Sequence, residues 1–345
     1  MSFNMSKSGK KIITGVAAGV LLIAVYFGFI LFVPNISPKT DKTAYLLIPE
    51  NASYADVMSQ LDSKADILST FSFNQAVKLM RFNVIKSGRY KIEKGTGNFR
   101  LIRNLMNGRQ TPVSLTFNNI RTKEQLAGRL AEQLMPDSVR ILNMLNDSAF
   151  LSKYDLNPTT SIAVFLPNTY EILWNITEQK LFERMNKEFT KFWTDSRKQK
   201  AAAIPLTPVE VCTLASIVDE ETNTKNEKAV VAGLYINRMN HKMPLQADPT
   251  VKFALGDFTI KRILFGHLKT NSPYNTYKYL GLPPGPIRIP ALETIDAVLN
   301  YYKSDYLYMC AKETLNGEHN FAATWAEHKL NAEKYQKTLN ERGIN

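Results

Sequence analysis

The longest uninterrupted run of hydrophobic residues lies near the start of the chain. No charged residue occurs from Ile12 to Val33, and at about 1.5 Å of rise per residue a helix of this length crosses the roughly 30 Å hydrocarbon core of a bilayer. Three lysines precede the run: Lys7, Lys10 and Lys11. The positive-inside tendency therefore predicts a cytoplasmic segment at 1–11, a transmembrane helix at 12–33 and the remaining chain outside the cytoplasm.

A cleaved signal peptide is the competing interpretation of this run. The run is longer than a usual signal hydrophobic region, and no clear small-residue cleavage site follows it, so we expect a retained anchor. Residues 34–43 (PNISPKTDKT) contain Pro and Lys without hydrophobic periodicity, which predicts a short linker.

Hydrophobic periods of two and of 3.6 residues then alternate and predict an α+β fold in two parts. Over 44–118 the pattern predicts a small module of β-α-α-β-α-β order. Its expected strands lie at 44–48, within 87–92 and at 113–117, and its expected helices begin after Ser53 and cover 72–82 and 98–107, the last ending at Gly108. Over 119–345 helices and short strands alternate in a larger mixed α+β domain, which opens with a capping box at 122–125.

The most informative helix is predicted to begin at Thr207. Thr207 can cap it, Pro208 suits its first position, and Glu210 completes a capping box. At about 100° per residue the apolar side chains gather on one side of this helix. Glu221 lies at the border of that side, so its carboxyl should lean into the core.

Glu221 is therefore the candidate for acid chemistry. A carboxyl has a pKa of about 4.3 in water, but desolvation raises it and leaves a protonated acid near neutral pH, as glycosidic cleavage requires. The alternative is a structural Glu paired with an Arg such as Arg238. Asp219 and Glu220 project away from the apolar side and are expected in solvent.

Composition adds a bias toward anionic partners. With 44% hydrophobic and 21% charged residues, the chain should be globular. Its net charge of +12 suits nucleic acid, anionic lipid or an acidic wall polymer as a partner, and the alternative is that the charge only keeps the protein soluble. Nucleic acid is disfavoured, because the predicted topology places the folded part outside the cytoplasm and no basic and aromatic motif occurs.

The two cysteines, Cys212 and Cys310, are expected to be buried packing thiols, with a disulfide between them as the alternative. Neither lies in a CxxC pattern or near His-rich ligand spacing. We therefore expect neither a metal nor another cofactor.

Several segments then resemble one family in their order along the chain. They are FLPNTY at 165–170, ASIVDEET at 215–222, YINR at 235–238, LQADPTV at 245–251, YNTY at 274–277, GLPPGPI at 281–287 and GEHNF at 317–321, followed by Thr324, Glu327, His328 and Asn331. The chain resembles the endolytic murein transglycosylases, also called the MltG or YceG-like family, over nearly its whole length, anchor included. The resemblance implies a YceG-like catalytic domain at 119–345 and a LysM-like module at 44–118, which either contacts glycan or serves as a spacer.

The family's catalytic Glu corresponds to Glu221, the second acid of its usual E-K-E-T motif. This sequence departs from the motif at Asp219, where Glu is usual, and at Glu220, where Lys is common, so their part in tuning Glu221 is open. The resemblance implies that Glu221 protonates the glycosidic oxygen between N-acetylmuramic acid (MurNAc) and N-acetylglucosamine (GlcNAc) within a nascent peptidoglycan strand. Its carboxylate would then take the proton of the muramoyl C6 hydroxyl, which closes a 1,6-anhydro ring without water or a second carboxylate.

The same resemblance implies a single-pass protein of the inner (cytoplasmic) membrane with its catalytic domain on the periplasmic side. Its partners would be glycan strands and cell-wall synthesis enzymes in the membrane. The residues expected to contact the sugar are Gln246, Asp248, Tyr274, Asn275, Tyr277 and His319. Their amide and imidazole groups suit hydrogen bonding and the tyrosines suit stacking, whereas the alternative for each is bracing of its own loop. For Asp248 the alternatives are a turn-stabilising residue and a second acid.

Two other functions remain open at this point. A hydrolytic muramidase would use Asp248 or Asp219 to direct water and would leave reducing muramoyl ends. A membrane-tethered scaffold would bind glycan or synthesis enzymes through its basic surface, and it would keep its function after Glu221→Gln.

Overall fold

The computed structural model describes residues 7–40 and 43–343. The chain divides into two compact units. The first contains the residues up to 114 together with 133–135 and 171–176, and the second contains the remaining residues; the boundary predicted from sequence was 118. Both units combine helices and strands, which confirms the α+β fold class.

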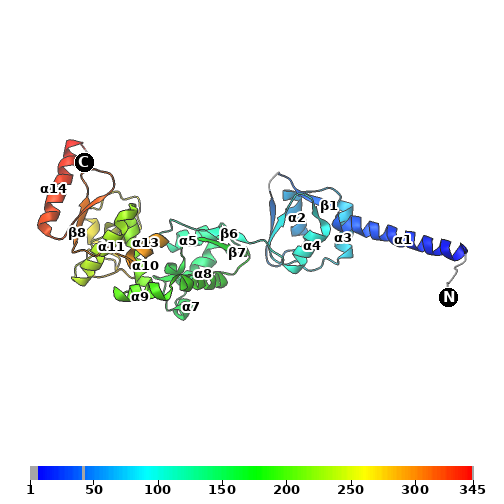
Figure 1. Cartoon of the computed structure of the whole chain (residues 1–345), viewed down its shortest axis with the longest axis horizontal. Coiled ribbons are helices and arrows are strands. Elements are labelled where there is room, and N and C mark those ends of the chain that lie inside the picture. Colours follow the sequence, from blue (N-terminus) through cyan, green and yellow to red (C-terminus); the bar gives the residue numbers. More distant parts are fainter. Residues whose placement is uncertain (1–6, 41–42, 344–345) are drawn as a thin grey trace. The chain divides into compact units, whose positions relative to one another are not determined.

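Helix α1 (Lys7–Phe32), the dark blue helix beside the N-terminus in Figure 1, contains the predicted transmembrane run. It is long and apolar enough to cross a membrane, and it is the one continuous helix of this kind within residues 7–40 and 43–343. The helix starts earlier than predicted, because residues 7–11 continue it beyond the apolar run.

The last turn of α1 belongs to the core of the first unit. Ile30 is 2% exposed and packs in that core. Its carbonyl accepts hydrogen bonds from Ser72 Oγ at 3.3 Å and from Asn98 Nδ2 at 2.8 Å. The apolar run is therefore partly protein core, and its end is fixed by side chains that lie much later in the sequence.

The linker predicted at 34–43 is wrong for its first half, because β1 (Pro34–Pro38) is a strand. It lies between β3 (Ala65–Ile67) and β5 (Thr96–Gly97) in an antiparallel three-stranded sheet. Ile36 at its centre is fully buried. The pairing partners of β1 are distant in sequence, so the local pattern gave no sign of it.

The other predicted elements of the first unit are confirmed. Strand β2 (Ala44–Ile48) pairs antiparallel with β4 (Gly88–Ile92). The helices packed with them around one hydrophobic core are α2 (Tyr54–Lys64), α3 (Thr70–Leu79) and α4 (Asn98–Asn107). Ser53 and Asp56 form the expected capping box, and Gly108 ends α4 in the left-handed conformation. Strand β6 (Val113–Thr116) follows and pairs with β7 (Thr169–Ile172).

The second unit is mostly helical. Its α-helices are α5 (Lys123–Ala131), α6 (Ser138–Asn146), α7 (Ser148–Leu151), α8 (Glu178–Phe192), α9 (Asp195–Ala203), α10 (Pro208–Glu221), α11 (Lys225–Asn240), α12 (Asp248–Leu255), α13 (Leu292–Leu299) and α14 (Trp325–Glu341). Its 3-10 turns are η1 (Ser152–Tyr154), η2 (Ser161–Val164) and η3 (His267–Lys269). Strands β8 (Tyr308–Ala311) and β9 (His319–Ala322) form an antiparallel pair.

The helix caps of this unit follow the sequence closely, with one exception. Thr122 caps α5, but the Gln125 side chain accepts the N–H of Arg121 at 2.9 Å, so the predicted capping box is incomplete. Thr207 and Glu210 form the complete capping box expected for α10.

Helix α10 lies inside the second unit, in contact with α9, α11, α12 and α13. Every residue from Val211 to Asp219 is buried. The one-sided apolar stripe predicted for this helix is therefore absent, because packing partners approach it from several sides. This packing carries the end of α10, and with it Glu221, into the interior.

Candidate active site

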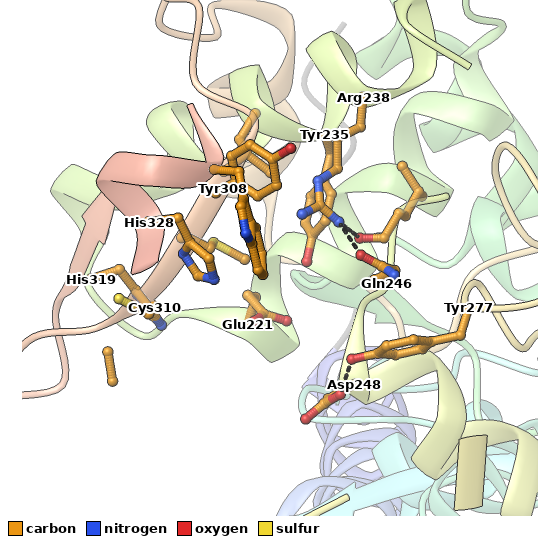
Figure 2. A pocket seen from close by; sticks show the side chains of 15 residues that line it. Glu221, Tyr235, Arg238, Gln246, Asp248, Tyr277, Tyr308, Cys310, His319 and His328 are labelled. Carbon is orange, nitrogen blue, oxygen red and sulfur yellow. Dashed lines mark hydrogen bonds between the residues drawn. The ribbon is translucent and has the colours of Figure 1, made fainter. Parts of the chain in front are cut away.

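Glu221 is the last residue of α10 and faces a cavity of about 320 Å³, called here the Glu221 cavity. Its walls come from α10, α11, the start of α12, the 277 loop, the β8 and β9 pair, and α14 (Figure 2). The carboxyl is half-buried, as its position on the helix predicted. Segments that lie far apart in the sequence thus surround one acid.

Burial raises the pKa of Glu221 to about 7. The positive charge of His319 and the Tyr235 hydroxyl lower this pKa, whereas the negative charge of Asp248 raises it. No ion pair to Glu221 occurs among the described residues, and its Oε2 is buried there without a hydrogen-bond partner. Near neutral pH the group is therefore divided between a protonated acid that can donate and a carboxylate that can accept.

Arg238 does not pair with Glu221, which was the structural alternative. Its guanidinium donates to the carbonyls of Leu245 at 2.8 Å and Leu307 at 2.6 Å and to Gln246 Oε1 at 3.2 Å. Arg238 is 8% exposed. It therefore ties α11 to the segments before α12 and β8, and it shapes the cavity instead of neutralising the acid.

Three residues expected from the loops around 246 and 277 line the cavity (Figure 2). The Tyr277 hydroxyl donates to Asp248 Oδ1 at 2.6 Å. Gln246 is exposed and adopts a φ of 54°, a left-handed conformation that non-glycine residues adopt mainly at constrained or functional positions. Its N–H donates to the Thr276 carbonyl at 3.1 Å, so the two loops brace each other behind the cavity.

His319, at the start of β9, also lines the cavity and is held by Glu227. Its backbone N–H donates to Glu227 Oε1 at 2.7 Å, and its Nδ1 lies 3.1 Å from Glu227 Oε2. The Thr222 hydroxyl donates to the same carboxylate at 3.2 Å. Glu227 thus links the residue that follows Glu221 to the imidazole.

Two other predicted residues do not line the Glu221 cavity. Asn275 is fully buried, and its side-chain amide donates to the carbonyls of Leu268 and Thr270 at 2.9 and 2.8 Å. The Tyr274 ring packs against Phe253, with 4.7 Å between centroids. Both side chains therefore brace their own loop, which was the alternative to sugar contact.

A cluster of rings that the sequence did not single out forms one side of the cavity. The aromatic wall, as we call it, consists of Tyr308, Trp325 and His328, with centroids 5.2–5.7 Å apart. Trp325 is 62% exposed. His328 belongs to the C-terminal motif given above, but that motif has no periodicity that would place it beside Glu221, and only the fold brings it there.

The cysteines differ in their surroundings. Both are free thiols, so they do not form the alternative disulfide. Cys212 is buried in α10, as predicted, and burial raises its pKa. Cys310 is half-buried and lines the Glu221 cavity, so its prediction as a core thiol is wrong. The strand that carries it covers the site and not the hydrophobic core.

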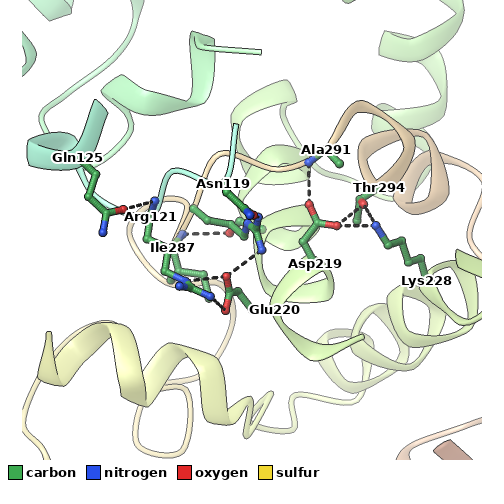
Figure 3. Close-up of polar contacts among 11 residues, drawn as sticks. Asn119, Arg121, Gln125, Asp219, Glu220, Lys228, Ile287, Ala291 and Thr294 are labelled. Carbon is green, nitrogen blue, oxygen red and sulfur yellow. Dashed lines mark hydrogen bonds and ion pairs between the residues drawn. The ribbon is translucent and has the colours of Figure 1, made fainter. Parts of the chain in front are cut away.

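Asp219 is buried and not solvated as predicted (Figure 3). Its carboxylate accepts hydrogen bonds from Lys228 Nζ at 2.7 Å, from the Ala291 N–H at 2.6 Å and from the Thr294 hydroxyl. Lys228 is itself buried and donates to Thr294 at 2.7 Å. Asp219 therefore fastens α10 to α11 and to the start of α13.

Glu220 is also removed from bulk solvent, since its side chain is 15% exposed. It accepts two hydrogen bonds from Arg121 at 2.9 and 3.0 Å and one from Arg288 at 2.9 Å (Figure 3). The three adjacent acids thus have three different surroundings, and Glu221 is the one that faces the cavity without a counter-ion among the described residues.

The fold and the cavity together define a class of protein: a mixed α+β protein with one carboxylic acid poised for acid–base chemistry in a polar and aromatic cavity. The chain belongs to the YceG-like family, whose sequence model matches residues 46–334.

Two relatives of the chain are named endolytic murein transglycosylase. The chain is 29% identical over 335 residues to the one from Bacillus subtilis (strain 168), and the match covers 92% of each chain. It is 26% identical over 355 residues to that of Streptococcus pneumoniae serotype 2 (strain D39), covering 91% of this chain and 63% of that protein. A 2.6 Å crystal structure of a yceG-like protein from Listeria monocytogenes matches with a TM-score of 0.57 and 25% identity, over 84% of this chain and 99% of that one.

Proposed function

We propose that this protein is an endolytic murein transglycosylase that cleaves the MurNAc–GlcNAc bond within nascent peptidoglycan strands and leaves 1,6-anhydro-MurNAc ends. The observation that carries the proposal is the surroundings of Glu221. Its pKa of about 7 and its unpaired, half-buried carboxyl suit a group that first donates a proton and then accepts one. The similarity to relatives of that name supports the substrate class.

The reaction needs one acid only. Protonated Glu221 gives its proton to the glycosidic oxygen as the bond from C1 to that oxygen breaks, and the bonding electron pair stays on the leaving oxygen. The muramoyl C6 oxygen bonds to C1, and its proton passes to the Glu221 carboxylate. Because a pKa near the operating pH makes both transfers feasible, the same group completes the cycle without water.

The aromatic wall gives the cavity a surface for sugar rings. Tyr and Trp rings combine a large apolar face with a polar edge, and Trp325 is exposed beside the cavity. Gln246, Asp248, Tyr277 and His319 then supply hydrogen-bonding groups at the same cavity. We propose that these groups bind the two sugars that flank the cleaved bond.

Mass analysis of glycan ends tests the reaction and the acid together. Wild-type digests of purified strands should carry anhydro ends, each one water lighter than a hydrolysed end. Glu221→Gln should reduce cleavage by about 10²–10⁴-fold and still fold, because Oε2 has no partner to lose. The matched control is Glu220→Gln, which changes the adjacent acid outside the cavity and should keep cleavage.

The hydrolytic muramidase stays a second candidate, because Asp248 lines the same cavity as Glu221. Its products would be reducing muramoyl ends. Such ends in the wild-type digest, together with loss of cleavage in Asp248→Asn, would establish that reaction and remove the transglycosylase proposal. A non-catalytic scaffold would instead bind strands without shortening them, and Glu221→Gln would leave its function unchanged.

We also propose that α1 anchors the protein in the inner membrane, with residues 1–11 in the cytoplasm and residues 44–345 on the periplasmic side. The length and apolar composition of α1 and its preceding lysines support this orientation. Protease added outside intact spheroplasts should digest the folded part and leave an N-terminal tag protected. Digestion of the tag as well would contradict the orientation and reopen nucleic-acid binding.

We propose further that the LysM-like module at 44–118 contacts glycan and that cell-wall synthesis enzymes in the membrane are partners of the protein. In the first unit the Arg89 guanidinium lies 3.5 Å from the centre of the Tyr45 ring, and this stacked pair offers a surface for glycan. The Glu221→Gln protein should bind strands less well after Tyr45→Ala if the module contacts glycan, and equally well if it is a spacer. Crosslinking in membranes would detect a synthesis enzyme beside the protein.

A further inference from the structure

Buried polar atoms without partners gather at one place in the molecule. Of the six side-chain atoms of this kind in the described part of the chain, three line the Glu221 cavity: Glu221 Oε2, Tyr235 Oη and His328 Nδ1. Burying a polar atom without a hydrogen bond costs free energy. Because three such atoms lie in one cavity, we expect them to gain hydrogen-bond partners when a substrate is bound or during the reaction.

Tyr235 is the most completely buried of the three residues. It lies on α11 and is 1% exposed. Its hydroxyl is close enough to Glu221 to lower the pKa of that carboxyl, yet neither atom completes a hydrogen bond. Burial, followed by the charge of Glu221, raises the pKa of Tyr235 well above its usual range, so the phenol keeps its proton. Toward Glu221 it can only donate.

Several other charged or titratable groups surround Glu221, including Tyr308 and Cys310 on β8. The others are Arg238 on α11, Asp248 and Lys252 on α12, Tyr277, His319 on β9 and His328 on α14. Arg238 is bound to carbonyls, Tyr277 to Asp248 and His319 to Glu227. His328 stacks on Tyr308, and Lys252 acts on Glu221 through its charge. Tyr235 differs from all of these groups, because it is almost fully buried and its hydroxyl is the hydrogen-bond donor that acts directly on the pKa of the Glu221 carboxyl.

We propose that Tyr235 is a positioning residue for Glu221: its hydroxyl donates a hydrogen bond to the Glu221 carboxylate while that group is ionised. This interval lies between loss of the Glu221 proton to the leaving sugar oxygen and return of a proton from the C6 hydroxyl, so the inference rests on the proposed function. No bond to Tyr235 forms or breaks, and its proton stays on the phenolic oxygen. The hydroxyl holds the carboxylate in the orientation that accepts the returning proton.

Tyr235→Phe in the full-length protein tests this role. The direct measurement is the titration of Glu221 by ¹³C carboxyl NMR, with its signal identified by its absence in Glu221→Gln. Loss of a donor to the charged form should raise the pKa of Glu221 by about one unit. The alkaline limit of activity should move upward with it, and kcat should fall about tenfold while KM stays unchanged.

The thermal stability of Tyr235→Phe distinguishes a positioning role of the hydroxyl from a purely structural one. The melting temperature of Tyr235→Phe should not fall, because the lost hydroxyl has no partner in the resting protein. The control is Tyr170→Phe, which removes another buried hydroxyl that donates to the Leu166 carbonyl at 2.7 Å. It should lower the melting temperature and leave the Glu221 titration in place.

Two results would overturn the inference: an unchanged titration of Glu221 in Tyr235→Phe, or a fall in melting temperature that accompanies the loss of kcat. Because the titration needs no substrate, it also separates this inference from the proposed reaction. If the titration shifts but digests contain no anhydro ends, the contact between Tyr235 and Glu221 is real and the transglycosylase proposal is wrong.

Discussion

Glu221 should set an alkaline limit on activity near neutral pH. In the proposed reaction Glu221 starts in its protonated form, and its pKa is about 7. Above that value the rate should fall about tenfold for each pH unit. The measurement is the rate of strand cleavage from about pH 5 to about pH 9, and a rate that stays level across this range would show that Glu221 is not the acid.

Asp248 should influence the reaction through its charge. It raises the pKa of Glu221, so Asp248→Asn should move the alkaline limit to lower pH and still give anhydro ends. Asp257→Asn, which changes an acid outside the cavity, is the control and should leave the limit in place. A limit that does not move would mean that the two carboxyls do not interact.

The raised pKa of Glu221 also predicts how stability changes with pH. Since the folded protein binds this proton more tightly than the unfolded chain, the contribution is present below about pH 4.5, the ordinary pKa of a glutamate carboxyl, and is lost as the pH rises to about 7. Glu221→Gln should therefore match the wild type at about pH 4 and be more stable by up to about 3 kcal/mol at about pH 8. Denaturant unfolding at the two pH values measures this, and equal stabilities at the higher pH would contradict the burial of a charge.

Asp219, which differs from the Glu usual in the family motif, stabilises the packing of α10 against α11 and α13. Asp219→Ala should cost about 3–5 kcal/mol, because it leaves the buried Lys228 with only the more distant Glu293 carboxylate at 3.4 Å and removes the acceptor of Ala291 and Thr294. Glu220→Ala, whose Arg121 and Arg288 partners are 39% and 15% exposed, should cost less, about 1–2 kcal/mol, because both arginines keep access to solvent. Equal losses in thermal unfolding would mean that burial does not distinguish the two acids.

Helix α11 depends on a close approach that one glycine permits. A Cβ on Gly233 would lie 2.3 Å from the Tyr302 carbonyl oxygen, so Gly233→Ala should destabilise by about 1–3 kcal/mol although alanine favours helices. Gly128 in α5 has nothing within 4 Å of the same position. Gly128→Ala should therefore stabilise by about 0.5–1 kcal/mol, and stabilisation by both substitutions would disprove the close packing of α11.

Elements with strong local signals were predicted well. The capping residues of α2 and α10 and the glycine that ends α4 lie within a few residues of the helix ends they fix, and such short-range interactions can be read from sequence. Strand β1 was missed because its hydrogen-bond partners, β3 and β5, lie elsewhere in the chain.

In the molecule as a whole, the apolar helix α1 and the core of the first unit share residues. A truncated chain that begins at residue 34 loses Ile30 from the core, together with the Ile30 carbonyl that accepts hydrogen bonds from Ser72 and Asn98. Its first unit should be less stable by about 2–4 kcal/mol than that of a chain beginning at residue 28. Hydrogen exchange in the first unit measures the difference, and equal protection would show that the last turn of α1 is dispensable.

The sequence by itself determined the hydrophobic run of α1, the start of α10 and the motifs that carry the family resemblance, and it predicted Glu221 as the acid. The apolar run and the helix start follow from composition and capping, which act over a few residues. Only the tertiary structure decided that Asp219 is buried, that Asn275 braces a loop, and that the aromatic wall and Cys310 line the cavity. Burial and the resulting pKa depend on side chains brought together from distant segments, and this proximity has no local pattern in the sequence.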